Sequence, residues 1–343
     1  MNADPDPLPA ATATCVAALY RFTALPDYKD WREPVRAALA ERHILGTVLL
    51  AAEGINGTIA GDERAIDEFL AWLVPTLGLG AGQAALNVKK SWHAAAPFLR
   101  LKVRLKREIV TMGVPDLEPA REAGTYVQPR DWNALISDPE VLTIDTRNDY
   151  EVSVGRFQNA VNPATATFRE FPDYARRELD PARHPKVAMY CTGGIRCEKA
   201  TAYLKRLGFA EVYHLQGGIL RYLEEVPADE SLWQGECFVF DDRVTVNHAL
   251  EAGTYTQCHA CRAALSPADL EDPHYQPGVQ CGFCFATTSA ERKSRHAERE
   301  RQIRLARDRG GAHLGAAAEA DREARTAAKR RRRRARQQPP EDR

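Results

Sequence analysis

The chain has 343 residues, of which 44% are hydrophobic and 27% charged, which excludes a disordered chain and is typical of a globular protein with apolar cores. Basic and acidic residues balance at 47 each, yet the region 286–343 holds 18 basic against 9 acidic residues, a segregation often found in proteins that meet nucleic acid. No segment has the pattern of a secretion signal, and no apolar run reaches the ~18 residues of a membrane span, so we expect a cytoplasmic protein with no membrane partner.

Strand and helix patterns alternate through residues 12–110 and predict a ferredoxin-like, acylphosphatase-like domain of the order β-α-β-β-α-β. The expected elements are a strand at 15–22, a helix at 28–43, a strand at 46–50, a helix over 62–77 and strands at 86–91 and 99–105. Within AEGINGTIAG, the pair Asn56-Gly57 predicts a hairpin turn.

Basic and apolar residues alternate in RLKVRLK, the last of these strands. Side chains on a strand point to alternate faces, so one face carries Arg100, Lys102, Arg104 and Lys106. One interpretation is the solvated face of a half-buried strand. The other is a stripe that contacts RNA phosphates, which the nearby Lys89, Lys90 and His93 would assist.

Residues 111–134 are rich in proline and glycine and have no apolar periodicity, which predicts a linker. Strands then alternate with helices over 135–232, the pattern of an α/β domain with a parallel sheet. We expect a strand at 141–147 that includes Asp145 and Arg147, a helix at 168–179, a strand at 186–190, a helix at 197–208 and a strand at 211–219.

A cysteine, Cys191, directly follows the strand KVAMY, at the end of a parallel strand where α/β sheets bind ligands. The loop after it consists of Thr192, Gly193, Gly194, Ile195 and Arg196. Inward-facing amides, a helix N-terminus and the Arg196 charge would all favour the reactive thiolate, whereas a cysteine without such a loop would be an ordinary core residue. The Cys-x4-Arg spacing is one residue shorter than that of phosphatase loops, which favours sulfur or persulfide chemistry over phosphotransfer.

Two cysteine pairs occur in the next segment, 233–289, and have the spacing C-x2-C…C-x2-C. Cys258, Cys261, Cys281 and Cys284 predict a closed structural zinc site, with local disulfides or free thiols as the alternative. The remainder, 290–343, predicts an exposed charged helix over 290–309 and a disordered tail. Its basic run 329–336 is either a solvated tail or a source of sequence-independent RNA affinity.

Three motifs make the segment 141–220 resemble a rhodanese domain: DTRNDYEVSVGRFQNAVNP, CTGGIR and LQGGI. Together with the preceding EGINGT domain and the paired cysteines, residues 15–290 resemble the rhodanese-domain tRNA uridine hydroxylases. These enzymes convert the wobble uridine, at position 34, to 5-hydroxyuridine with oxygen. The resemblance implies that Cys191 is the active-site thiol and that Asp145, Arg147 and Glu151 support its loop. Cys197 either resolves an oxidised Cys191 or packs the base of the helix.

The resemblance further implies an oxidoreductase with molecular oxygen as co-substrate and the tRNA anticodon arm as partner. The Cys191 thiolate would add to C6 of an extruded uridine, or would itself carry oxygen or a persulfide. Two other classes stay open: a rhodanese-type sulfurtransferase that carries a persulfide on Cys191, and a non-catalytic RNA-binding adaptor. The intact loop argues against the adaptor.

Overall fold

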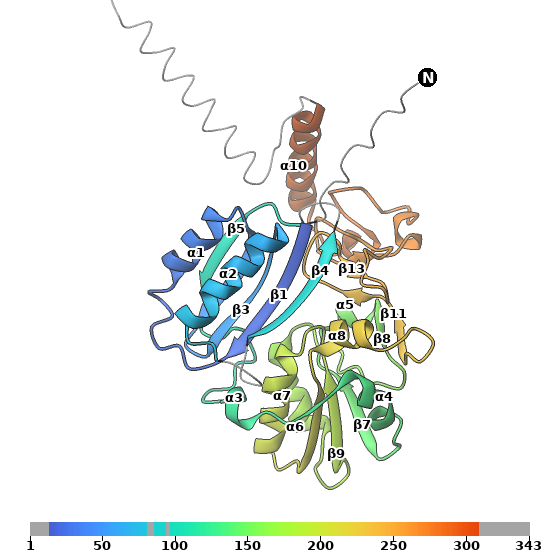
Figure 1. Ribbon diagram of the computed structural model, residues 1–343. Coiled ribbons are helices and arrows are strands. Elements are labelled where there is room, and N and C mark those ends of the chain that lie inside the picture. The colour runs from blue at the N-terminus through green and yellow to red at the C-terminus, as the bar shows by residue number, and fades with distance from the viewer. Residues whose placement is uncertain (1–13, 81–85, 94–96, 309–343) are drawn as a thin grey trace, which may run out of the picture. The chain divides into compact units, whose positions relative to one another are not determined.

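The computed structural model describes residues 14–80, 86–93 and 97–308 (Figure 1). The chain forms two compact units, one up to Thr256 and one from Gln257 onward. Within the described ranges, no helix is both long enough and apolar enough to cross a membrane. The basic run 329–336 lies outside the described residues.

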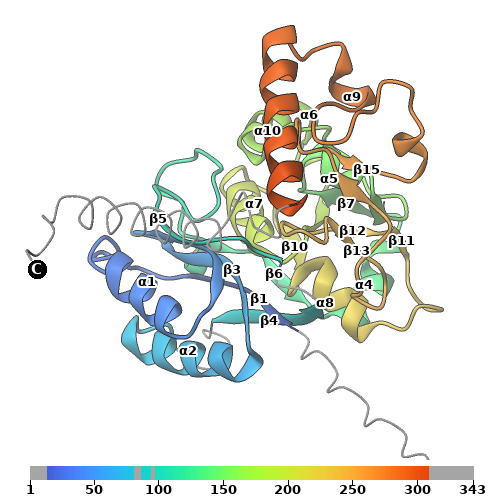
Figure 2. The same ribbon diagram turned by 90° about the horizontal axis from the view of Figure 1, so that it is seen from above.

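The first domain of unit 1 is a five-stranded sheet with two helices (Figures 1 and 2). Its elements are β1 Thr14–Phe22, α1 Arg32–Glu41, β2 Leu45–Ala51, β3 Gly54–Gly61, α2 Glu63–Thr76, β4 Asn87–His93 and β5 Leu101–Leu105. The strand order is β4-β1-β3-β2-β5, and only β5 runs parallel to its neighbour. This arrangement confirms the predicted ferredoxin-like, acylphosphatase-like fold, which β5 extends beyond β2.

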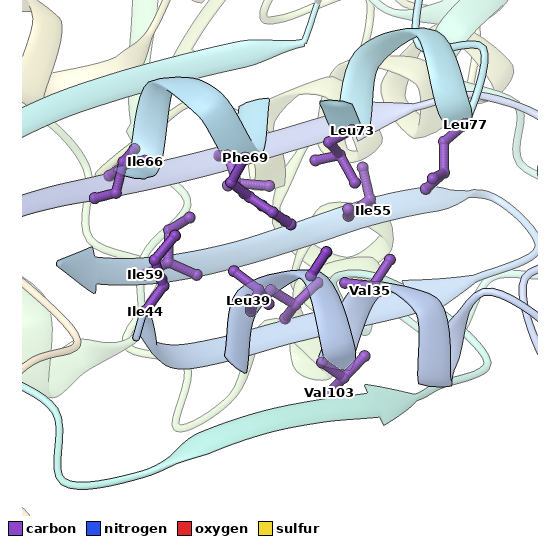
Figure 3. Packing of buried hydrophobic residues seen from close by; sticks show 14 of the residues in the cluster. Val35, Leu39, Ile44, Ile55, Ile59, Ile66, Phe69, Leu73, Leu77 and Val103 are labelled. Carbon is purple, nitrogen blue, oxygen red and sulfur yellow. The ribbon is translucent and has the colours of Figure 1, made fainter. Parts of the chain in front are cut away.

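Both helices pack on one face of this sheet, because strand residues point alternately to its two sides. Leu39 of α1 and Phe69 and Leu73 of α2 meet Ile55 and Ile59 of β3 in a fully buried core (Figure 3). The alternate residues of the same strands lie on the opposite face, which we call the open face. It includes Ala18, Tyr20, Thr47, Leu49, Asn56, Thr58, Asn87 and Lys89.

The predicted hairpin turn at Asn56-Gly57 is wrong. Both residues lie inside β3, and the turn is formed by residues 52 and 53. A Cβ on Gly57 would lie only 2.7 Å from the carbonyl oxygen of Thr47. Glycine therefore permits a close approach of two strands here, rather than a turn.

The second domain of unit 1 has a parallel four-stranded sheet of order β6-β10-β9-β7. Its elements are α3 Pro119–Glu122, β6 Thr125–Val127, α4 Pro129–Ile136, β7 Val141–Asp145, α5 Asp149–Val152, β8 Gly155–Phe157, a 3-10 turn Phe168–Glu170, α6 Phe171–Glu178, β9 Lys186–Tyr190, α7 Ile195–Arg206, β10 Glu211–Leu215 and α8 Gly218–Glu225. The predicted rhodanese-type α/β architecture is confirmed.

Helices cover both faces of this sheet, as a parallel sheet requires. On β9, Val187 and Met189 face the cluster that includes residues of α6 and α7. Ala188 and Tyr190 face the cluster that includes residues of α4 and α8. The central strand is thus buried on both sides, which explains the apolar run KVAMY.

Two segments differ from their sequence-based description. The stretch 111–134, expected as a linker, contains α3, β6 and the start of α4, and β6 pairs with β10. Pro119 and Pro129 are first-turn residues of these helices, so the prolines begin elements rather than interrupt them. Residues 233–256 belong to unit 1, where β11 Trp233–Gly235 pairs with β8, and β12 Cys237–Phe238 pairs with β13 Thr245–Val246.

Up to residue 308, where the described structure ends, the second unit contains the four predicted cysteines and one long helix. Its elements are β14 Thr256–Gln257, which starts at the last residue of unit 1, its partner strand β15 Ala264–Leu265, a 3-10 turn Ala268–Leu270, α9 Gly282–Phe285 and α10 Ala290–Asp308. Cys258, Cys281, Cys284 and Leu265 form its small buried cluster.

Candidate active site

The thiol loop connects β9 to α7. Cys191 and Cys197 are both fully buried. Gly194 adopts φ 97°, a left-handed conformation that suits glycine, and its N–H points at the Cys191 Sγ atom at 3.1 Å. The helix begins at Ile195, two residues earlier than predicted, because this left-handed residue already turns the chain into it.

The LQGGI turn, residues 215–219, hydrogen-bonds to the backbone of the same loop. The backbone N–H groups of Ile219 and Leu220, in the first turn of α8, donate to the carbonyl oxygens of Cys191 and Thr192 at 3.0 and 3.1 Å. A Cβ on Gly218 would lie 2.4 Å from the Cys191 carbonyl oxygen, so only glycine fits this contact. The motif therefore fixes the backbone that carries the thiol.

The surroundings of Cys191 favour its thiolate. Burial raises the pKa of this thiol, but a hydrogen bond from the Cys197 thiol, the Arg196 charge and the nearby backbone amides outweigh burial and lower the pKa to about 6. The pKa of Cys197 is instead raised, because that thiol is buried beside the Cys191 anion. Cys197 also lies 3.5 Å from the Thr146 hydroxyl.

The Arg196 guanidinium is paired with a carboxylate and not with the sulfur. Its guanidinium makes two hydrogen bonds of 2.6 Å to the Glu151 carboxylate, which is fully buried. Burial raises the pKa of Glu151, and this pairing lowers it further than burial raises it. The loop arginine thus anchors the loop to α5 while its charge still acts on the thiolate.

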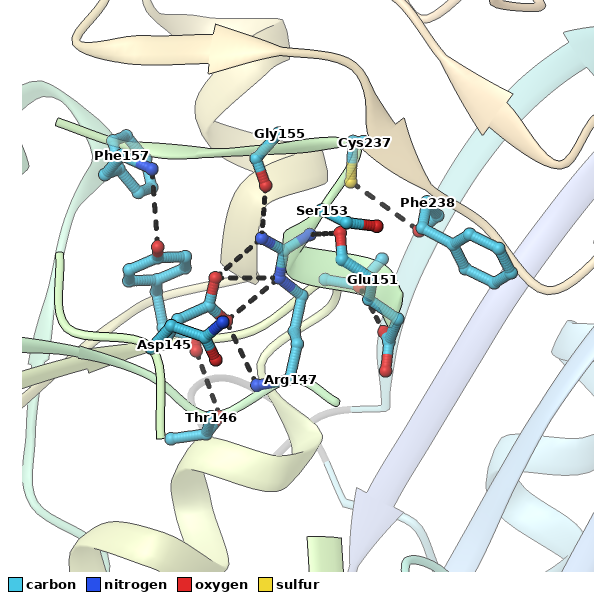
Figure 4. Close-up of polar contacts among 12 residues, drawn as sticks. Asp145, Thr146, Arg147, Glu151, Ser153, Gly155, Phe157, Cys237 and Phe238 are labelled. Atoms are coloured by element: carbon cyan, nitrogen blue, oxygen red, sulfur yellow. Dashed lines mark hydrogen bonds and ion pairs between the residues drawn. The ribbon is translucent and has the colours of Figure 1, made fainter. Parts of the chain in front are cut away.

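Asp145 and Arg147, which were expected to support the loop, form a buried pair that does not contact the thiol itself (Figure 4). Arg147 is fully buried and pairs with both oxygens of Asp145. It also donates to the carbonyl oxygens of Glu151 and Gly155, at 3.0 and 2.5 Å. The pair therefore fixes α5 and β8, and through Glu151 it fixes Arg196.

The thiol opens into a cavity of about 580 Å³ between the two domains of unit 1. One wall is the thiol loop, and the facing wall is the open face of the first domain. The lining also includes Phe98, Phe168 and Phe240, and the last of these is 58% exposed. Sequence analysis predicted the loop but not the wall that faces it.

The basic strand lies at the edge of that wall. Lys102 and Arg104 of β5 pair with Thr47 and Leu49 of β2, so they share the open face with the cavity. Lys106 itself lines the cavity. All four predicted RNA-contacting residues are exposed: Arg100, Lys102, Arg104 and Lys106.

A hydrogen-bonded chain crosses from the open face to α7. Tyr20 of β1 donates to the buried Glu198 carboxylate at 2.9 Å, and Asn87 of β4 donates to the Tyr20 hydroxyl at 3.2 Å. Sequence reasoning missed these residues. The only available signal was the position of Glu198 directly after Cys197.

A buried ion triad lies beside this chain. The Lys199 ammonium is 2.8 Å from the Glu53 carboxylate and 2.6 Å from that of Glu108, and it donates to the Val110 carbonyl oxygen. Glu53 comes from the EGINGT motif and Lys199 from the motif CEK after the loop. The two motifs thus hold the domains together beside the thiol.

The four cysteines of unit 2 fit a tetrahedral metal site. Their sulfur atoms all lie within 4.8 Å of one another, and all four are free thiols. The Sγ atoms of Cys261 and Cys281 are 3.7 Å apart, and those of Cys281 and Cys284 are 3.8 Å apart. A zinc–sulfur bond of about 2.3 Å gives tetrahedral edges of about 3.8 Å. The set would hold a structural metal ion with no open position.

Comparison with protein families identifies both domains of unit 1. Residues 128–225 match the rhodanese-like domain, and residues 14–109 match the UPF0176 acylphosphatase-like domain. The fold and the loop thiol therefore define a rhodanese-like protein with an acylphosphatase-like domain before it. Each match covers one domain, and the first of the two domain descriptions is the acylphosphatase-like domain of UPF0176 proteins.

Solved structures resemble single domains of the chain. A rhodanese-like domain from Anabaena sp. is 19% identical, covers 32% of this chain and 78% of its own, and has a TM-score of 0.27. A rhodanese-related protein from Thermoplasma volcanium is 23% identical, with coverages of 30% and 93% and a TM-score of 0.24. An acylphosphatase from Coxiella burnetii is 23% identical, with coverages of 27% and 93% and a TM-score of 0.21.

Proposed function

We propose that this protein is an oxygen-dependent tRNA hydroxylase that converts uridine 34 to 5-hydroxyuridine, with Cys191 as the reacting thiol. The observation that carries the proposal is the cavity, in which a thiol of lowered pKa faces a polar sheet from a second domain. Its volume of about 580 Å³ lies within the roughly 300–1,000 Å³ of small-ligand sites, which leaves room for a nucleotide.

The basic edge of the same sheet supports an RNA substrate. Lys102, Arg104 and Lys106 would contact backbone phosphates while a base enters the cavity. Chemistry on a base requires that base outside the stack, and the unpaired anticodon loop makes its extrusion inexpensive. The tRNA anticodon arm therefore offers both the phosphates for the basic edge and an easily extruded base for the cavity.

The proposed chemistry begins with the thiolate. Its electron pair forms an S–C6 bond, and the C5=C6 pair moves toward C4 and O4, which makes C5 nucleophilic. C5 takes up dioxygen, and two electrons and two protons from an external two-electron reductant cleave the O–O bond and release water. Loss of the C5 proton then expels the thiolate and restores the double bond. The sum is uridine, oxygen, two electrons and two protons giving 5-hydroxyuridine and water.

The test uses cells that lack the gene and express the wild type, Cys191→Ala or Cys237→Ala. Cys237 is a matched control, because it is equally buried but lies outside the loop, and burial raises its pKa to about 12. We expect mass spectrometry of wobble nucleosides to find 5-hydroxyuridine derivatives with the wild type and Cys237→Ala only. Their absence with the wild type would refute the function, and their full recovery with Cys191→Ala would remove the thiol from the chemistry.

The rhodanese-like domain also supports an enzymatic role of a second kind, transfer of sulfane sulfur through a persulfide on Cys191. The same experiment separates the two functions. A sulfurtransferase predicts the loss of a thiolated nucleoside with Cys191→Ala, whereas 5-hydroxyuridine derivatives would not change.

A further inference from the structure

A hydroxyl group enters the thiol cavity from the opposite domain. Tyr20 lies on the open face and lines the cavity together with Cys191. Its hydroxyl also lies directly against the thiol loop, since a Cβ on Gly194 would be 2.8 Å from it. The N–H of that glycine points at the sulfur. A base held over Cys191 therefore lies within the reach of Tyr20.

Behind Tyr20 is a carboxyl group that can hold a proton. Glu198 is 7% exposed and follows the thiol loop on α7. The titratable groups that face it are Tyr20 and Arg21 of β1, Tyr126 of β6 and Cys191. Burial raises the pKa of Glu198 to about 7, although the hydrogen bonds from the two tyrosines act to lower it.

The pKa values of the two acids of the site are thus shifted in opposite directions, that of Cys191 downward and that of Glu198 upward. Cys191 is ionised at neutral pH, while Glu198 still carries its proton over part of that range. Pairs of groups with such divergent environments mark the nucleophile and the acid of many active sites. Tyr20 is the hydroxyl that connects this acid with the cavity, at 2.9 Å from the carboxylate.

We propose that Tyr20 is a catalytic residue that passes a proton from Glu198 to O4 of the base as Cys191 attacks C6. The inference rests on the proposed function and assigns the acid for its first step. The S–C6 bond forms, the C5=C6 pair becomes a C4=C5 double bond, the C4=O4 pair moves to O4, and O4 takes the Tyr20 proton. Tyr20 takes the Glu198 proton in turn, which leaves the carboxylate. No electrons enter or leave in this step.

The hydrogen bonds around Tyr20 allow this transfer. With Glu198 ionised, Tyr20 donates to it, as in the structure. With Glu198 protonated, the carboxyl can donate to the Tyr20 oxygen, which frees the hydroxyl hydrogen for the base. Asn87 donates to the same oxygen at 3.2 Å and so holds the hydroxyl in place.

Tyr126 provides a matched control within the same network. It also hydrogen-bonds Glu198, but it is 46% exposed and is not among the described residues that line the cavity. Tyr126→Phe removes a hydrogen bond from the carboxylate while the cavity hydroxyl stays. Tyr20→Phe removes the cavity hydroxyl itself.

The experiment measures single-turnover hydroxylation of unmodified tRNA against pH, and alkylation of Cys191 in the same proteins. General acid catalysis contributes about 10²–10⁴-fold, so Tyr20→Phe should slow hydroxylation by about 100-fold or more while alkylation changes by less than about threefold. Glu198→Gln should be similarly slow and lack the fall in rate above about pH 7 that the wild type shows. Tyr126→Phe should keep most of the rate and move that fall to higher pH, since its hydrogen bond lowers the Glu198 pKa.

Three outcomes would overturn the relay alone. Tyr20→Phe with the wild-type rate, or equal losses in Tyr20→Phe and Tyr126→Phe, would exclude Tyr20 as the acid. A parallel loss of hydroxylation and alkylation in Tyr20→Phe would make its role structural. In each case a wild type that hydroxylates and a Cys191→Ala protein that does not would leave the proposed function intact. No hydroxylation by the wild type would refute the proposed function and the relay together.

Discussion

A substitution of Lys199 tests how much the ion triad between the two domains of unit 1 contributes to the stability of the fold. Its side chain is 2% exposed and lies between the carboxylates of Glu53 and Glu108. In Lys199→Met a chain of similar length fills the space, but two carboxylates face each other without a cation. Removal of one partner from a buried ion pair costs about 3–5 kcal/mol, and we expect the free energy of unfolding to fall by that amount at neutral pH.

Acid should reverse part of this loss. In the wild type, burial raises the pKa of both carboxyls. For Glu53 burial dominates, and its pKa stays raised. For Glu108 the hydrogen bonds from Lys199 and from the N–H groups of Met112 and Gly113 outweigh burial, and its pKa is lowered. Without the lysine, the folded-state pKa of these carboxyls rises above the unfolded value of about 4.3. The penalty is then absent below that pH and grows as pH rises through the raised folded-state pKa.

The assay is urea unfolding followed by tryptophan fluorescence, at neutral pH and near pH 5. Lys186→Met is the matched control, because the pair of Lys186 with Glu140 is 2.8 Å long but lies at the surface. Such pairs are worth about 0–1 kcal/mol. Equally small losses in the two variants at neutral pH, or no recovery of Lys199→Met in acid, would refute the reasoning.

Three further predictions address the thiol, the metal site and the basic edge. The rate of Cys191 alkylation by iodoacetamide should rise with a midpoint near pH 6, and a midpoint near that of an ordinary thiol, about 8.5, would contradict a stabilised thiolate. Cys258→Ser should lower the zinc content of the purified protein, measured by plasma mass spectrometry, and unchanged zinc would exclude the four-sulfur site. The double change Lys102→Glu and Arg104→Glu should weaken anticodon stem-loop binding and reduce its salt dependence by about one unit of slope per lost phosphate contact, whereas Arg64→Glu on α2 should do neither.

The sequence predicted the architecture of each domain because periodicity reports burial. The apolar run KVAMY, buried on both faces, and the strand–helix alternation were sufficient for the parallel sheet. The prediction failed at Asn56-Gly57, where a turn signal lies inside a strand. Gly57 is needed there because a neighbouring strand approaches closely, and that neighbour is not visible in the local sequence.

The candidate site also has some features that the sequence predicts and others that depend on the folded structure. Cys191, its glycines and Arg196 lie within six consecutive residues, so their proximity could be predicted from the strand–loop–helix pattern. The pairing of Arg196 with Glu151 could not be derived from spacing, since α5 reaches the loop only through the folded sheet. The cysteine pairs differ in this respect, because the C-x2-C…C-x2-C spacing already predicted the four-cysteine cluster that unit 2 forms.

The sequence by itself determined the two domain folds, the loop that carries Cys191 and the two cysteine pairs, because short-range periodicity and spacing encode them. Only the tertiary structure decided what faces Cys191. Tyr20 and Glu198 are 178 residues apart, and Lys199 reaches Glu108 across 91. Tyr20 lies in a strand, Glu198 and Lys199 lie in a helix, and Glu108 lies in a loop. Each meets its partner only where the two domains dock and shield the polar groups from water.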